Sequence, residues 1–89
     1  MAKPLKVKVA QALRKAVGDG ARIEFENAPG QPLVGLVLSD FFAGKSAGER
    51  QDHVWKYLDA SLSAPERRRI AFIVTDTPRE HEVLKAAAG

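Results

Sequence analysis

The chain has 89 residues, a formal net charge of +3 and no cysteine. This length fits one small domain, with little room for a deep substrate cavity beside a core. The lack of cysteine excludes disulfides, thiolate metal sites and cysteine nucleophiles. The longest apolar run, residues 33–38, is far too short to span a membrane, and no signal-peptide pattern begins the chain. We therefore expect a cytoplasmic protein with a single domain over residues 1–89.

An amphipathic helix is predicted from about Pro4 to Val17. Leu5, Val9 and Leu13 recur at the four-residue spacing of an apolar stripe, which is typical of a helix that lies on a core. Gly18 then supplies the residue that ends helices most easily.

An antiparallel hairpin is predicted next. Residues 21–26 alternate between apolar and charged side chains, which indicates a strand with one face in water. Residues 27–31 combine Asn, Pro and Gly, the residues that form turns. Residues 33–38 are apolar on both faces, so this strand is expected in the middle of a sheet.

A second helix is expected to begin with the capping pair Ser46 and Glu49. Its predicted inward stripe consists of Gln51, Val54, Trp55, Leu58 and Leu62. Arg50 and His53 lie off that stripe and are expected in solvent.

The same capping pattern at Ser63 and Glu66 predicts a short helical turn, and residues 70–74 predict a buried third strand. A strand, a helix and a strand in this order favour a right-handed crossover, so the third strand should lie parallel to the second.

A last helix is predicted to begin at Thr77-Pro78, and Val83, Leu84 and Ala87 should dock it on the sheet. The predicted fold class is α/β (α+β), a single small domain in the order α-β-β-α-(turn)-β-α with a three-stranded mixed sheet.

The sequence contains no complete motif for catalysis or for metal binding. Gly44-Lys45-Ser46 resembles part of a phosphate-binding loop, but Ser39 stands where that loop requires a glycine. His53 and His81 have no ligand three or four residues away, so both are predicted to be surface residues. We expect a binding protein rather than an enzyme, with no cofactor and no metal ion.

The clearest charged feature is Arg67-Arg68-Arg69, immediately before the last strand. Three adjacent cations are hard to pair within so small a fold. A patch that touches phosphates or an acidic partner is one interpretation, and a solvated edge is the other.

The run Phe42-Ala43-Gly44-Lys45-Ser46, followed by Arg50, resembles the BolA signature F-x-G-K-S with an arginine four residues on. The element order and the later Thr77-Pro78-x-Glu80 fit the same template over about residues 5 to 84. The resemblance implies a fold similar to the type II KH domain. It also implies either DNA contacts in transcriptional regulation or partnership with monothiol glutaredoxins through a bridging iron–sulfur cluster.

The sequence departs from the family at its ligand positions. Gln51 stands where the family usually has a histidine, and Ile70 stands at the position of the cluster-ligand histidine. The loop at 27–31 contains neither cysteine nor histidine. Because an aliphatic side chain has no lone pair to give to iron, cluster bridging in the family's usual manner is not expected.

The leading hypothesis is a regulatory BolA-like module that contacts nucleic-acid phosphates. Its candidate contact residues are Lys45, Arg50, Arg67, Arg68 and Arg69. The alternative is a protein adaptor that docks a monothiol glutaredoxin, or a related iron–sulfur trafficking partner, without supplying the usual ligands. No membrane partner is expected, and the chain is expected to be a monomer or a weak homodimer.

Overall fold

The computed structural model describes residues 3–27 and 29–88, with side chains to residue 86. Residues 1, 2 and 89 of the predicted domain, and Ala28 of the predicted turn, lie outside the described residues. The elements are α1 (Leu5–Val17), β1 (Arg22–Glu26), β2 (Leu33–Leu38), η1 (Asp40–Phe42), α2 (Ala47–Ser61), α3 (Ala64–Arg67), β3 (Ile70–Asp76) and α4 (Pro78–Ala88).

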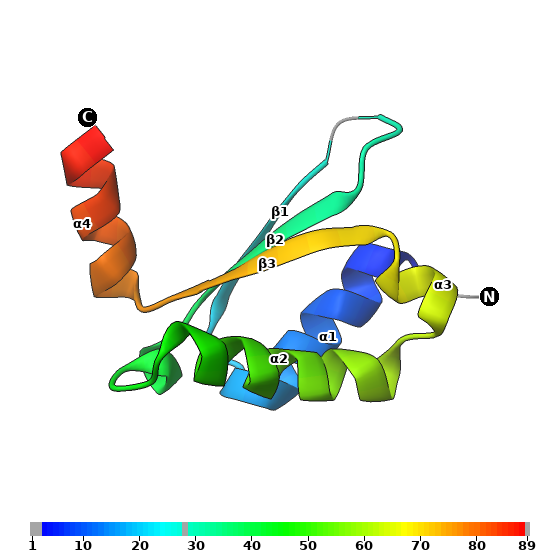
Figure 1. The fold of residues 1–89 in the computed structure, drawn as a ribbon, viewed down its shortest axis with the longest axis horizontal. Coiled ribbons are helices and arrows are strands. Elements are labelled where there is room, and N and C mark those ends of the chain that lie inside the picture. Colours follow the sequence, from blue (N-terminus) through cyan, green and yellow to red (C-terminus); the bar gives the residue numbers. More distant parts are fainter. Residues whose placement is uncertain (1–2, 28, 89) are drawn as a thin grey trace.

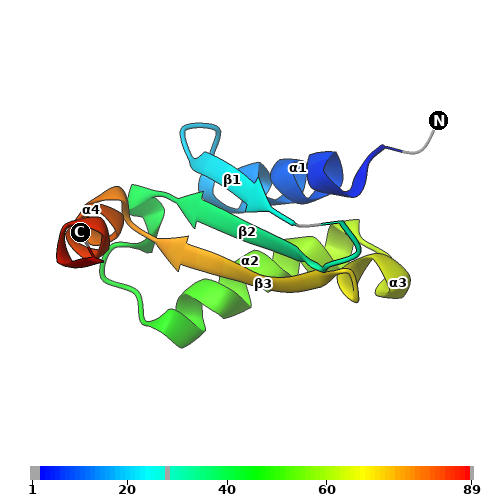
Figure 2. The ribbon, with the colours of Figure 1, turned by 90° about the horizontal axis from the view of Figure 1, so that it is seen from above.

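The three strands form one mixed sheet in the order β1-β2-β3. β1 runs antiparallel to β2 and β3 runs parallel to it, as the sequence predicted. Helices α1 and α2 lie together beneath one face of this sheet, whereas the opposite face carries no helix layer (Figure 1). Figure 2 looks down on that open face.

The core fills the space between the sheet and the helix pair α1 and α2. The predicted stripe positions Val9, Leu13, Val54 and Leu58 are fully buried there, together with Phe42. On the sheet side the backbone comes close to its neighbours at Gly35. A Cβ at that position would lie 2.8 Å from the Cδ1 atom of Ile73 and 3.5 Å from the Phe25 ring.

Both predicted capping boxes of the second half are present. The Ser46 hydroxyl accepts from the Glu49 amide, and the Glu49 carboxylate accepts from the Ser46 amide, at the start of α2. Ser63 and Glu66 make the same reciprocal pair at the start of α3. These side chains satisfy amides that a helix start leaves without partners.

The predicted docking of α4 on the sheet is wrong. Val83 and Leu84 are 62% and 59% exposed, and α4 projects from the end of β3 (Figure 1). Ala87, the third predicted contact, lies outside the described side chains. Only Thr77 separates β3 from α4, so the chain has no loop with which to fold the helix back over the sheet.

The burial of α1 makes a direct prediction for stability. Leu13→Ala should lower the free energy of unfolding by about 2–5 kcal/mol, because it opens a cavity in a fully buried site. Val7 on the same helix is 41% exposed. Val7→Ala should therefore change the free energy of unfolding by less than about 0.5 kcal/mol. Urea unfolding followed by Trp55 fluorescence measures both. Equal losses in the two variants would contradict this placement of the core.

Candidate functional site

The five predicted contact residues fall into two groups at opposite ends of α2. Lys45 and Arg50 lie at its start, whereas Arg67, Arg68 and Arg69 follow its end, in and just after α3 (Figure 1). A helix of 15 residues separates its two ends by about 22 Å. The five residues therefore do not form one patch.

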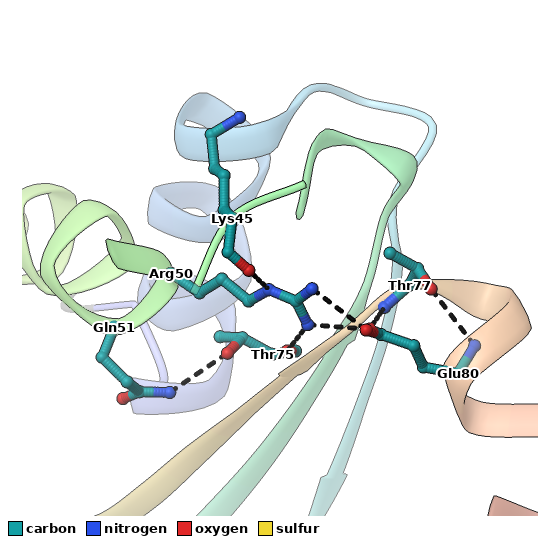
Figure 3. A network of polar contacts seen from close by, with 6 residues as sticks. All are labelled: Lys45, Arg50, Gln51, Thr75, Thr77 and Glu80. Carbon is teal, nitrogen blue, oxygen red and sulfur yellow. Dashed lines mark hydrogen bonds and ion pairs between the residues drawn. The ribbon is translucent and has the colours of Figure 1, made fainter. Parts of the chain in front are cut away.

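Arg50 is buried, so the prediction that it lies in solvent is wrong. Its Nη1 and Nη2 atoms donate to the two Glu80 carboxylate oxygens at 2.7 and 3.0 Å (Figure 3). Nη1 also donates to the Thr75 carbonyl at 3.1 Å, and Nε donates to the Lys45 carbonyl at 2.9 Å. The long side chain reaches across to the edge of β3, where these acceptors meet. With four of its five N–H donors engaged, Arg50 has little capacity left for a phosphate.

Glu80 completes this junction from the first turn of α4. Its Oε1 atom accepts from the Thr77 amide at 2.8 Å, and its own amide donates to the Thr77 hydroxyl (Figure 3). The hydrogen bonds from Arg50 and then from the Thr77 backbone lower the pKa of Glu80 to about 2. In return, the Glu80 carboxylate raises the pKa of Arg50 above its ordinary value. The pair thus joins α2, β3 and α4 through charge-assisted hydrogen bonds.

Gln51 seals the same edge of the sheet one residue further along α2. Its Nε2 atom donates to the Ile73 carbonyl at 2.8 Å and to the Thr75 hydroxyl at 3.2 Å. Its Oε1 atom accepts from the Trp55 indole. β3 is an edge strand, and such edges are otherwise free to pair with a foreign strand. Gln51 therefore bonds to the edge strand of the sheet.

Lys45 lies beside a row of three rings, Phe41, His53 and Tyr57. Its ammonium donates to the Phe41 carbonyl at 3.0 Å and lies 4.2 Å from the centre of the Phe41 ring. The Phe41 and His53 rings lie 4.6 Å apart at an angle of 32°, and the His53 and Tyr57 rings lie 5.2 Å apart at 54°. The Nε2 atom of His53 lies 2.7 Å from the Ala16 carbonyl, to which it must donate. His53 is therefore half-buried between α1 and α2 and is not the freely solvated residue that the sequence predicted.

The arginine run has one engaged member and two exposed ones. Arg67 donates to the Leu62 carbonyl at 2.8 Å and lies 3.5 Å from the Asp59 carboxylate. Arg68 and Arg69 are exposed and line a groove of about 600 Å³ between the start of α1, the β1–β2 turn and the end of α3.

Lys6 of α1 lines the same groove, which we call the cationic groove after Lys6, Arg68 and Arg69. None of the described residues that line it is acidic. The first turn of α1, at its rim, has neither an acidic residue nor a capping side chain. Sequence reasoning missed Lys6 because it lies at the opposite end of the chain from the arginines.

An ion pair holds the two sides of the cationic groove together. The Lys8 ammonium of α1 donates to the Glu66 carboxylate of α3 at 2.7 Å. This bond is the first cause, and the Ser63 backbone the second, that lowers the pKa of Glu66 to about 2. Lys8 and Glu66 thereby place the arginine run next to Lys6.

Neither of the two positions at which the resemblance implies a histidine, Gln51 and Ile70, offers a ligand for iron. Ile70 is a buried core residue, and Gln51 is bonded to β3. Over the described part of the chain, no three His, Cys, Asp or Glu side chains come together as a metal site would require. Among residues 3–27 and 29–88, none of the helices combines the length and apolarity needed to cross a bilayer.

Comparisons with known proteins bear on the fold. The chain matches no protein-family model and no curated protein. Among solved structures, it is similar to the crystal structure of a Bol-like protein from Babesia bovis. The similarity covers 96% of this chain and 95% of that chain, with 22% identity and a TM-score of 0.59. The chain is thus a small α+β module of known architecture. Its fold is BolA-like, as the signature at residues 42–50 indicated.

The Arg50–Glu80 pair makes a prediction about pH. The pKa of Glu80 is depressed from 4.5 to about 2, so its contribution to stability is complete above pH 4.5 and is lost as the pH falls through 2. Glu80→Gln should therefore lower the free energy of unfolding at pH 7 and have much less effect at pH 2. Urea unfolding at the two pH values measures the difference.

The control for this measurement is Glu82→Gln, an exposed neighbour on the same helix. It should have little effect at either pH. If Glu80→Gln costs the same free energy at pH 7 and pH 2, the ion pair with Arg50 does not set the pKa of Glu80.

Proposed function

We propose that the chain is a non-enzymatic BolA-like binding module that contacts nucleic-acid phosphates through the cationic groove. The observation that carries this proposal is the convergence of Lys6, Arg68 and Arg69 on one concave surface with no acidic lining among the described residues. Cations gathered in this way repel one another and attract anions. When such cations neutralise nucleic-acid phosphates, they release the counter-ions that were condensed around the phosphates.

The proposed phosphate contacts differ from the set of residues that the sequence suggested. Arg68 and Arg69 are the principal contacts, and Lys6 is added to them. Arg67 contributes charge while it holds the Leu62 carbonyl and the Asp59 carboxylate. Arg50 and Lys45 are assigned no phosphate, because Arg50 is committed to Glu80 and Lys45 lies at the far end of α2 on Phe41.

The start of α1 supports the same assignment. The first amides of a helix have no intrahelical partner, and together with the helix dipole they favour a negative charge. Here these amides lie at the rim of the cationic groove, with no side chain capping them. Phosphate contacts of this kind position a protein on nucleic acid without reading its sequence. A regulatory role through occupancy of duplex DNA follows from the proposal.

A protein adaptor that docks a monothiol glutaredoxin is the second candidate, and the BolA-like fold is the observation in its favour. Such docking would proceed without a cluster ligand from Gln51 or Ile70, because the first is bonded to β3 and the second is buried. It would depend on shape and apolar contact, so it would tolerate salt far better than phosphate binding does.

Binding to a short fluorescent DNA duplex, followed by anisotropy at several salt concentrations, tests the proposed function. Removal of two phosphate contacts by Arg68→Ala with Arg69→Ala should weaken binding at low salt. It should also make the slope of log K against log salt shallower by about 2, since each contact contributes about one unit.

The matched control is Arg14→Ala with Lys15→Ala, which removes the same charge at the other end of α1. It should leave most of the affinity and slope intact. If the two double variants weaken binding equally, net charge rather than the cationic groove attracts DNA. If the wild-type chain fails to bind at low salt, the proposed function is wrong.

A further inference from the structure

The open face of the sheet carries a partly exposed apolar block. In the register of the strands, Val34 of β2 lies opposite Phe72 of β3, and Leu36 lies opposite Val74. These residues alternate with the core residues of the same strands, so all four point away from α1 and α2. Phe72 is 53% exposed. The four side chains form the floor of a groove of about 540 Å³, which we call the sheet groove.

The sheet groove has a charged wall and a helical wall. Glu24 and Glu26 of β1 line one side, and their partners across the sheet are Leu36 and Val34. His81 of α4 lines the other end. In Figures 1 and 2, α4 stands at the end of the sheet and leaves the open face uncovered.

Helix α4 is the second exposed apolar surface of the chain. Val83 and Leu84 are each more than half exposed, although large apolar side chains normally gain by burial. The hydrogen bonds and the ion pair described above hold only the first turn of the helix, at Thr77 and Glu80. A helix of 11 residues is marginal in water without packing, so α4 requires an apolar surface to lie on.

We propose that a second copy of this chain covers the sheet groove, with α4 of each copy lying on the sheet of the other in a two-fold symmetric dimer. One chain carries both a helix, α4, with exposed apolar side chains and a sheet face without a helix layer. Its own α4 is kept from the groove by the single-residue connection at Thr77 and by the Arg50–Glu80 pair. When two copies exchange their α4 helices, the apolar side chains of both helices and of both sheet faces are buried. The two-fold symmetry leaves neither surface free for a third copy.

The charges at the edges of the two surfaces are complementary. Glu24 and Glu26 border the sheet groove. Helix α4 carries Arg79 in its first turn and Lys85 in its last, together with the exposed Glu82 and with Glu80, whose carboxylate is bonded to Arg50. Glu24 also pairs with Arg22 at 3.0 Å on the exposed surface, where such a pair contributes little. Opposite charges around an apolar contact fix the orientation of the partner and disfavour others. A second copy supplies both the apolar side chains and the matching cations. The dimer does not depend on the proposed function.

Sedimentation equilibrium over a range of protein concentrations tests the dimer. The wild-type chain should show reversible association from monomer to dimer. Leu84→Asp should raise the dissociation constant by at least about tenfold, because each dimer loses two buried leucines. Val7→Asp on α1, an exposed apolar site on the far layer, should leave the constant unchanged. Circular dichroism checks that each variant stays folded.

A charge exchange tests the orientation without changing the apolar contact. Lys85→Glu alone should weaken the dimer, and so should Glu24→Lys with Glu26→Lys. When the two variants are mixed, each α4 meets a sheet of opposite charge, so heterodimers should form with an affinity close to that of the wild type. Recovery on mixing would show that each variant alone lost affinity through like charges and not through misfolding, because a misfolded chain would not associate with either partner.

Four outcomes would overturn the proposal. The wild-type chain could remain a monomer at every concentration. It could form a dimer that is insensitive to Leu84→Asp, which would place the interface elsewhere. The mixed charge variants could fail to associate. A monomer in which NMR detects contacts between Leu84 and Phe72 would show that α4 closes on its own sheet, which also contradicts the exchange.

Discussion

The guanidinium of Arg50 is held in one place by the Glu80 carboxylate and by the carbonyls of Thr75 and Lys45. This contact determines where α4 leaves the sheet, because it fixes the first turn of that helix against α2 and β3. The direction of α4 in turn leaves the outer face of the sheet uncovered. An arginine buried in this way requires its carboxylate partner, since a buried charge without one is costly. This ion pair, together with the single-residue connection at Thr77, thus leaves the apolar side chains of α4 and of the outer sheet face exposed.

The residues of the BolA-like signature have structural roles in this chain. Phe42 is fully buried in the core. Gly44 has a φ of +77°, a conformation that side chains with a Cβ rarely adopt. Ser46 caps α2, and Arg50 joins α2 to β3 and α4. The signature therefore specifies the turn between β2 and α2 and the junction beyond it. The chemistry proposed for the protein lies elsewhere, at the cationic groove and the sheet groove.

The two surfaces differ in the physics of what we propose that they bind. The cationic groove gathers charge around a helix start and favours an anion whose binding weakens with salt. The sheet groove offers apolar side chains bordered by carboxylates and favours an amphipathic helix with cations at its edges. The cationic groove lies by the β1–β2 turn, whereas α4 stands at the other end of the sheet (Figure 2). A dimer through the sheet groove would therefore place two cationic grooves in one assembly.

The sequence alone determined the four α-helical segments and the three strands, because helical stripes, strand alternation and capping pairs are local patterns. It also determined the mixed sheet, since a right-handed crossover constrains β3 once β2 and α2 are known. The site depended on contacts between distant residues. Arg50 lies off the apolar stripe, yet its length lets it reach Thr75 and Glu80. Lys6 meets Arg68 only because α1 packs beside α3. A local pattern carries no information on such pairs, so only the tertiary structure decided which charges are buried and which remain free to bind.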